Sequence, residues 1–175
     1  MEELDPTCAT SSRDGILMVF TGEGWGKSAA AIGYSIRARG MGWATTMVQF
    51  LKGGSWNAAE ISATERMGID WPVLSSRLTW APRDLRGLSD RAWEHAAGAL
   101  EGPGPALVVL DELSHAIDGG WLDLGRVTSG LESRARQVSV IITGADVQDE
   151  LCDLADTVTT FERSKHLAKK GVLGP

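Results

Sequence analysis

The sequence predicts an α/β protein whose sheet is mostly parallel, has five or six strands and is covered by helices on both faces. Short apolar runs alternate along the chain with longer segments whose apolar residues recur at helical spacing. Strands and helices in this alternation form right-handed βαβ crossovers, which make the strands parallel. The length of 175 residues suits one domain. We expect it at residues 15–163, between a flexible N-terminal arm (1–14) and a C-terminal tail (164–175).

The expected strands are apolar runs bounded by turn residues, a pattern typical of strands buried on both faces of a parallel sheet. One of them contains Pro72, which cannot donate a ladder hydrogen bond, so we expect this strand at an edge of the sheet. In chain order the runs lie at residues 15–20, 44–50, 69–74, 106–110, 138–143 and 157–161.

The expected helices lie between these strands. Gly40 ends the first helix, because glycine readily adopts the conformation that closes a helix. The helix that precedes residue 106 is amphipathic, with Ala92, Trp93 and Ala96 on one side. The helices are expected at residues 27–39, about 58–67, 88–100, about 122–136 and 148–155.

The composition excludes several classes of protein. A net charge of −6 and a pI near 5.1 argue against general binding to nucleic acid or to anionic membranes. Two cysteines, Cys8 and Cys152, cannot build a disulfide framework or a four-ligand zinc site. The N-terminal residues do not resemble a signal peptide, and the apolar runs are too short to span a bilayer. We expect a cytoplasmic protein without nucleic-acid or membrane partners.

A glycine-rich segment between the first strand and the first helix predicts a phosphate-binding loop. Glycines let consecutive N–H groups turn toward phosphate oxygens, and the following helix N-terminus adds partial positive charge. Lys27 would reach the phosphates and the Ser28 hydroxyl would bind Mg²⁺. The alternatives are a glycine-rich turn without a ligand, or a dinucleotide fingerprint, which Lys27 disfavours because it replaces the third glycine. The expected nucleotide-binding residues are Thr21, Gly22, Glu23, Gly24, Trp25, Gly26, Lys27 and Ser28.

An acidic pair follows the most apolar strand of the chain. Asp111 and Glu112 come directly after residues 107–110, so we expect a strand that ends in carboxylates beside the phosphate loop. Asp111 would hold Mg²⁺ directly or through water, with Glu112 nearby. The alternative is that these residues only end the strand and cap the next helix. Together with the loop, the pair favours the fold of P-loop NTPases.

The chain resembles the P-loop ATP:corrinoid adenosyltransferases. The resemblance runs from Gly15 to about Gly171 and includes Thr21, which departs from the strict Walker pattern. Its order and spacing make it more specific than a phosphate loop alone. It rests on Val19-Phe20-Thr21-Gly22, Val48-Gln49-Phe50-Leu51-Lys52-Gly53, Thr79-Trp80, Val109-Leu110-Asp111-Glu112-Leu113, Ile142-Thr143-Gly144, Leu154-Ala155-Asp156-Thr157-Val158 and Lys165-His166.

The resemblance implies a homodimeric enzyme that moves the 5′-deoxyadenosyl group of ATP to the Co(I) of a reduced corrinoid and releases triphosphate. The corrinoid would be cob(I)alamin, cobinamide or cob(I)yrinic acid a,c-diamide, reduced by a reductase or a flavodoxin-like protein. Lys27 would contact the triphosphate, while Ser28, Asp111 and Glu112 would serve the Mg²⁺. Trp80 and Leu78 match an aromatic pair that closes the lower face of the corrin in the family, although Leu78 is not aromatic.

Three other positions depart from the family and leave a second interpretation open. Members usually carry Lys at the position of Trp25, and Arg at the positions of Ala145 and Glu162, although Arg163 is adjacent. Each lost charged hydrogen bond to triphosphate would cost about 1.5–3 kcal/mol. The alternative is therefore a catalytically impaired paralogue that acts as a nucleotide- or corrinoid-binding regulatory module. An ordinary P-loop kinase or GTPase is disfavoured, because the chain has no Asn-Lys-x-Asp motif.

Overall fold

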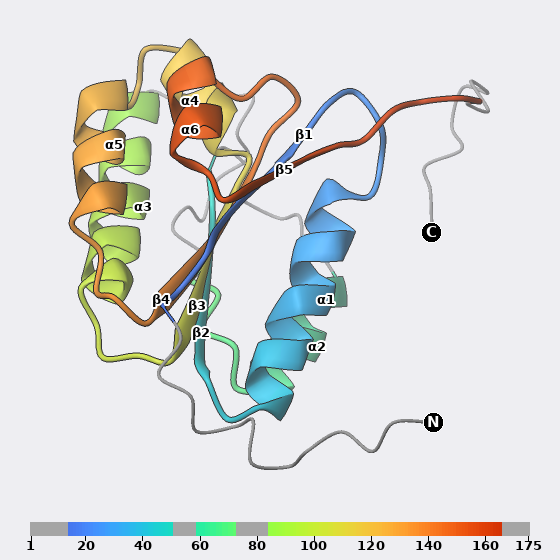
Figure 1. Ribbon diagram of the computed structural model, residues 1–175, viewed down its shortest axis with the longest axis vertical. Coiled ribbons are helices and arrows are strands. Elements are labelled where there is room, and N and C mark those ends of the chain that lie inside the picture. Colours follow the sequence, from blue (N-terminus) through green and yellow to red (C-terminus); the bar gives the residue numbers. More distant parts are fainter. Residues whose placement is uncertain (1–13, 51–58, 73–83, 166–175) are drawn as a thin grey trace.

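The centre of the structure is a sheet of five parallel strands in the order β2-β3-β4-β1-β5 (Figure 1). It is seen in a computed structural model, which describes residues 14–50, 59–72 and 84–165. The predicted α/β fold with a parallel sheet is confirmed. The strands are β1 (Leu17–Thr21), β2 (Ala44–Gln49), β3 (Ala106–Asp111), β4 (Val138–Thr143) and β5 (Thr157–Thr160).

Helices cover both faces of the sheet, as Figure 1 shows, with α1 and α2 on one side and the other four on the opposite side. Two of them begin at aspartates whose side chains accept a backbone N–H of the first turn, Asp84 before α3 and Asp123 before α5. None of the helices in the described ranges is long and apolar enough to cross a membrane. The helices are α1 (Lys27–Gly40), α2 (Ala59–Arg66), α3 (Leu85–Leu100), α4 (Leu113–Asp118), α5 (Leu124–Glu132) and α6 (Asp149–Leu154).

Side-chain alternation along the strands divides the core into two layers. In β1, Leu17 and Val19 join the larger layer beneath α3 and α5, while Met18 and Phe20 face α1. All four of these side chains are buried, which explains why the strand reads as one continuous apolar run rather than as an alternating one. The same holds for β3 and β4, which are buried along their whole length.

Several expected elements differ from the structure. A short helix, α4, follows Glu112 and was not predicted, because six residues give too little periodicity to recognise. The helix expected at 122–136 is shorter, since Asp123 caps its start and it ends at Glu132. The run expected as a strand at 69–74 forms only one bridge, between Asp70 and Thr46, in its described part.

Some predictions fall on residues outside the described ranges. These are most of the expected arm and tail, and Leu78 and Trp80, which therefore stay predictions.

Candidate functional site

The predicted phosphate loop joins the end of β1 to the start of α1. Gly22 and Gly26 have φ angles of 98° and 107°, a region that glycine adopts without steric cost. The ammonium group of Lys27 reaches back across the loop and donates to the carbonyl oxygens of Gly22 (2.5 Å) and Gly24 (2.9 Å). Within the described part of the chain, the N–H groups of Gly26, Lys27 and Ser28 have no acceptor. A row of unused donors at a helix N-terminus is suited to bind an anion.

The segment after β5 holds this loop from one side. Phe161 donates its N–H to the Thr21 carbonyl (2.8 Å) and accepts the Gly24 N–H on its own carbonyl (2.7 Å). A Cβ atom on Gly24 would lie 2.6–2.8 Å from backbone atoms of Phe161 and Glu162, so only glycine fits there. The Phe161 ring also packs against Phe20 at 5.7 Å between centroids. The loop is thus fixed by residues far away in the sequence.

Arg163 extends from the same segment onto the loop. Its guanidinium donates to the backbone carbonyl of Glu23 (3.2 Å) and lies 3.7 Å from the Glu23 carboxylate. Both side chains are substantially exposed, at 44% and 77%. Arg163, rather than Glu162, therefore provides a cation at the rim of the loop.

The other side of the loop is attached to the segment after β4. The Ala145 carbonyl accepts the Gly22 N–H (2.9 Å) and the Thr21 hydroxyl (3.3 Å), and the Val147 N–H donates to that hydroxyl. The Thr21 side chain is thus used within the protein. Trp25 lies at the tip of the loop and is 62% exposed, so an aromatic surface stands where the family usually has a cation.

Asp111 lies at the same edge of the sheet, fully buried at the end of β3. β4 lies between its strand and β1, whose end carries the phosphate loop. Thr143, the last residue of β4, donates its hydroxyl hydrogen to Asp111 Oδ1 (2.7 Å). Gln49, the last residue of β2, donates to Asp111 Oδ2 (2.9 Å). Both oxygens of the buried carboxylate are therefore held by neutral groups from the flanking strands.

Glu112 adopts a left-handed backbone conformation (φ 60°), which is costly for a residue with a side chain. Its N–H donates to the Thr143 hydroxyl (3.0 Å), and its carboxylate lies 2.8 Å from Nδ1 of His115. The conformation turns the chain abruptly from β3 into α4. As a result, the side chains of Asp111 and Glu112 have different partners although the residues are adjacent in sequence: Asp111 contacts Gln49 and Thr143, and Glu112 contacts His115.

The donors at this edge fit a magnesium ion that arrives with a nucleotide. Asp111 has no Lys or Arg partner in the described residues, so a divalent cation would balance its buried charge. Over the same residues, no group of three His, Cys, Asp or Glu side chains could hold a metal ion alone. Mg²⁺ is usually bound by one or two carboxylates together with phosphates and water, which matches such a sparse set.

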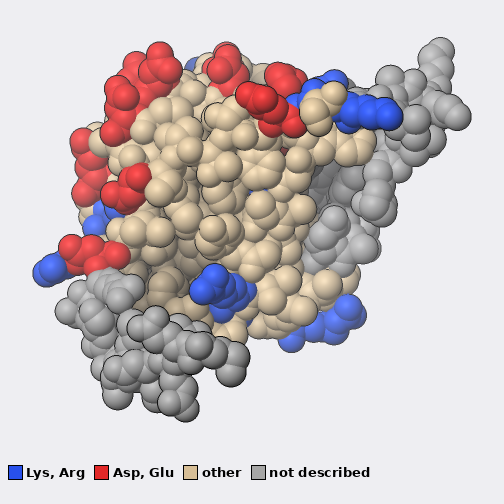
Figure 2. All heavy atoms as spheres, turned by 45° about the vertical axis from the view of Figure 1, so that its right-hand side comes forward, with Lys and Arg blue, Asp and Glu red and all other residues tan. Residues whose placement is uncertain are grey.

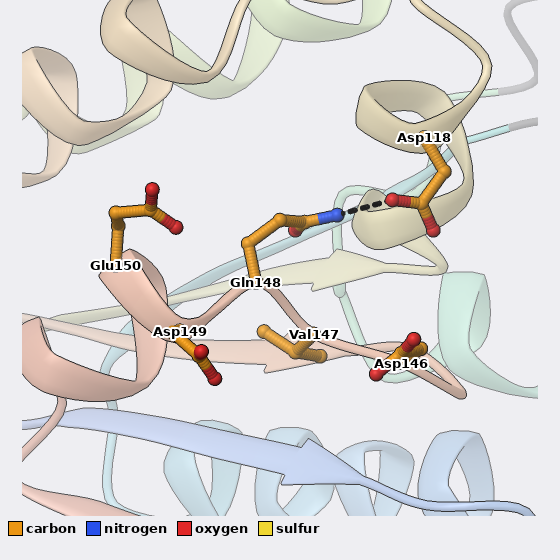
Figure 3. Close-up of a pocket in the computed structure, with 6 residues that line it drawn as sticks. All are labelled: Asp118, Asp146, Val147, Gln148, Asp149 and Glu150. Atoms are coloured by element: carbon orange, nitrogen blue, oxygen red, sulfur yellow. Dashed lines mark hydrogen bonds between the residues drawn. The ribbon is translucent and has the colours of Figure 1, made fainter.

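A separate acidic hollow of about 350 Å³ lies beside the end of β4, lined by residues 146–150 and Asp118. Figure 3 shows Gln148 reaching toward Asp118, to which it donates at 2.7 Å. Acidic side chains also gather along the upper edge of the surface in Figure 2. Burial, followed by the charges of Asp149, Asp153 and Asp146, raises the pKa of the Cys152 thiol nearby. This acidic region repels anions, in contrast to the phosphate loop with Lys27 and Arg163.

The structure therefore brings the predicted residues from Thr21 to Ser28 together in one loop, at the same sheet edge as Asp111 and Glu112. Sequence reasoning missed Gln49, Thr143, Phe161 and Arg163 as parts of the site. One signal was available for Gln49 and Thr143, because each is a polar residue that ends an apolar strand, as Asp111 does.

Comparisons with known proteins show the family of the chain. Residues 13–174 match the family described as ATP:corrinoid adenosyltransferase BtuR/CobO/CobP. The chain is 36% identical to the corrinoid adenosyltransferase of Escherichia coli, over 98% of this chain and 89% of that protein. It is 37% identical to corrinoid adenosyltransferase CobA of Salmonella typhimurium (90% and 82%), and 36% identical to the Pseudomonas aeruginosa corrinoid adenosyltransferase (90% and 80%). Since the family match covers nearly the whole chain, the protein belongs to the ATP:corrinoid adenosyltransferase family.

Proposed function

We propose that this protein transfers the 5′-deoxyadenosyl group of MgATP to the Co(I) centre of a reduced corrinoid and releases triphosphate, in the formation or salvage of adenosylcobalamin. Its family supports the reaction class. The observation in the structure that supports it most is the glycine loop with Lys27, placed at the same sheet edge as the buried carboxylate of Asp111, which has no Lys or Arg partner among residues 14–50, 59–72 and 84–165. Cob(I)alamin, cobinamide and cob(I)yrinic acid a,c-diamide are the candidate acceptors.

The chemistry needs alignment and charge stabilisation more than it needs a base. Co(I) of the substrate supplies the electron pair for the new bond to C5′, while the C5′–O bond breaks and its electrons leave with the triphosphate. No proton has to be removed, so Glu112 has no role as a general base. The protein must hold C5′ in line with the cobalt and stabilise the negative charge that grows on the leaving group.

The phosphate loop would supply that stabilisation. The unused N–H groups of Gly26, Lys27 and Ser28 are directed donors that need no reorganisation when charge develops. The Lys27 ammonium now satisfies two loop carbonyls, and it would exchange them for phosphate oxygens when nucleotide binds. Loop and lysine together replace much of the solvation that triphosphate loses.

Ser28 and Asp111 would hold the Mg²⁺, with Glu112 close by. When bound, the ion neutralises part of the triphosphate charge and so makes triphosphate a better leaving group. The role of the protein is to present a small number of rigidly held metal ligands. Asp111 is fixed through both carboxylate oxygens, which keeps its orientation independent of the ligand.

The corrinoid side of the site is proposed from the resemblance alone. Trp80 and Leu78 would cover the lower face of the corrin and exclude an axial ligand, which makes Co(II) easier to reduce. We further propose a cytoplasmic homodimer that receives electrons from a reductase or a flavodoxin-like protein.

The direct test is incubation of the protein with MgATP and chemically reduced cobalamin or cobinamide. The expected result is a light-sensitive Co–C product, formed together with triphosphate. The Lys27→Ala variant serves as the control, since it removes the loop cation. If the wild type forms no light-sensitive product with either corrinoid at any ATP concentration, the proposed reaction is wrong.

The second candidate is an impaired paralogue that binds nucleotide or corrinoid without turnover. Trp25, Ala145 and Glu162 favour it, because each removes a cation that the family usually has. Calorimetry with ATP and with corrinoid separates the two, since binding of either ligand without product would support the regulatory module. Arg163 at the loop rim is the observation that argues for retained catalysis.

A further inference from the structure

A row of three polar residues crosses the carboxyl edge of the sheet. Gln49, Asp111 and Thr143 end the neighbouring strands β2, β3 and β4. Gln49 is paired in register with Asp111, and β3 pairs with β4 up to Leu110 and Ile142, directly before Asp111 and Thr143. The parallel register thus places all three side chains side by side, with Asp111 in the middle.

The hydrogen bonds in this row have a defined direction. A backbone N–H can only donate, so the Thr143 hydroxyl accepts from Glu112 (3.0 Å) and must point its single hydrogen at Asp111 Oδ1 (2.7 Å). Gln49 donates its amide to Asp111 Oδ2 (2.9 Å). Each carboxylate oxygen therefore receives one neutral donor and keeps a second lone pair for another partner.

Thr143 is the connection between the two acidic residues. It is completely buried, and its one hydroxyl fixes the Asp111 carboxylate and also the backbone of Glu112 in its left-handed conformation. Loss of the hydroxyl would remove a hydrogen bond from the buried Asp111 carboxylate and from the partly buried Glu112 N–H at the same time. If Thr143 served only for packing, the volume of its side chain would matter and its hydroxyl group would not.

We propose that Thr143, assisted by Gln49, is a positioning residue that orients Asp111 and Glu112 toward the divalent cation of the nucleotide. This inference rests on the proposed function, because it takes the cation to be the one that accompanies ATP. Residues that orient metal ligands in this way typically change metal affinity by about 10- to 100-fold when they are replaced.

The experiment measures Mn²⁺ binding in the presence of ATP, from the increase in water-proton relaxation when protein is added to a solution in which the Mn²⁺ is already bound to ATP. Thr143→Val, which keeps the size and removes the hydroxyl, is expected to weaken Mn²⁺ binding about 10- to 100-fold. Its ATP affinity in EDTA should stay within twofold of the wild type, and Thr143→Ser should restore Mn²⁺ binding. The matched control is Thr45→Val, which makes the same change at a buried threonine near the start of β2, away from Gln49 at its end. This control should leave the dissociation constant for Mn²⁺ unchanged.

Two results would overturn the inference. One is a Thr143→Val protein with wild-type Mn²⁺ affinity; the other is equal loss of ATP affinity with and without metal, which would mean general damage to the site. If Thr143→Val does not fold, Gln49→Leu at the partly exposed end of the row gives the test, and an unchanged Mn²⁺ constant there overturns the proposal. A wild type that binds ATP without any metal dependence would instead refute the magnesium site of the proposed function.

Discussion

The substitution Gly24→Ala tests whether the segment after β5 holds the phosphate loop in place. An alanine Cβ at this position would lie 2.6 Å from the Phe161 carbonyl carbon, 2.7 Å from its oxygen and 2.8 Å from the Glu162 nitrogen. All three are backbone atoms, so no side chain can rotate away to relieve the clash. The φ angle of Gly24 is outside the left-handed region, which makes the cost of Gly24→Ala steric rather than conformational.

The magnitude follows from two contributions. Overpacking a close contact costs about 1–3 kcal/mol, and separation of the two segments also breaks the 2.7 Å hydrogen bond from Gly24 to Phe161. Together they amount to about 2–4 kcal/mol. If the loop moves locally, this free energy is lost from ATP binding, so we expect ATP affinity to fall about 30- to 700-fold.

Gly33→Ala is the matched control, because it makes the same chemical change in the middle of α1. No atom lies within 4 Å of the added methyl group, and alanine is the better helix former by about 0.5–1 kcal/mol. Calorimetric titration with ATP and thermal unfolding should show unchanged affinity and a slightly higher Tm for this variant. Gly24→Ala with the ATP affinity of Gly33→Ala would show that the segment after β5 does not hold the loop.

Three further substitutions test other parts of the site. Asp111→Asn should lower the rate of product formation at least 100-fold without lowering Tm, because it removes a buried charge that has no cation partner in the part of the chain that the structure describes; retained metal-dependent activity would contradict this. Arg163→Ala should raise the KM for ATP about 10-fold and alter the free energy of unfolding by less than about 1 kcal/mol, since its pair with Glu23 is exposed. Glu23→Gln should lower the KM for ATP, because it removes the carboxylate that competes with ATP for Arg163. If both substitutions shift the KM in the same direction, Glu23 and ATP do not compete for Arg163. In a Cys8→Ser background, alkylation of Cys152 should have its pH midpoint higher in the folded than in the urea-unfolded protein, because a raised pKa leaves less thiolate at any given pH; equal midpoints would contradict the shift.

The loop and the strands could be predicted because both are local in sequence. Gly22, Gly26 and Lys27 lie within six residues, and their conformations follow from residue type and from the helix that begins there. The apolar runs predicted five or six mostly parallel strands, because strands buried on both faces, such as β1, β3 and β4, appear in the sequence as continuous apolar runs. These features need no knowledge of which strands are neighbours.

The surroundings of the loop could not be predicted, because they depend on the order of the strands. β1, β3 and β4 are all short, buried apolar runs, so nothing local places β4 between β1 and β3. Without that order, Thr143 cannot be assigned to Asp111, 32 residues before it. The contact of Arg163 with Glu23 joins residues 140 positions apart, across the β1–β5 pairing. Nor does residue type indicate that Glu112 takes a left-handed conformation, since that depends on the hydrogen bond from its N–H to Thr143.

The charges around the loop suggest how a protein of net charge −6 could bind triphosphate. Positions 25, 145 and 162 hold Trp, Ala and Glu rather than basic residues. The hollow beside the segment after β4 is lined mainly by carboxylates. Backbone N–H groups, Lys27 and Arg163 remain, and Arg163 is partly neutralised by Glu23. A larger share of the charge neutralisation must then come from the cation that accompanies ATP. On the proposed function, that would place more weight on Asp111, whose carboxylate is held by the neutral groups of Gln49 and Thr143. A lysine or arginine in their place would compete with the cation that the nucleotide brings.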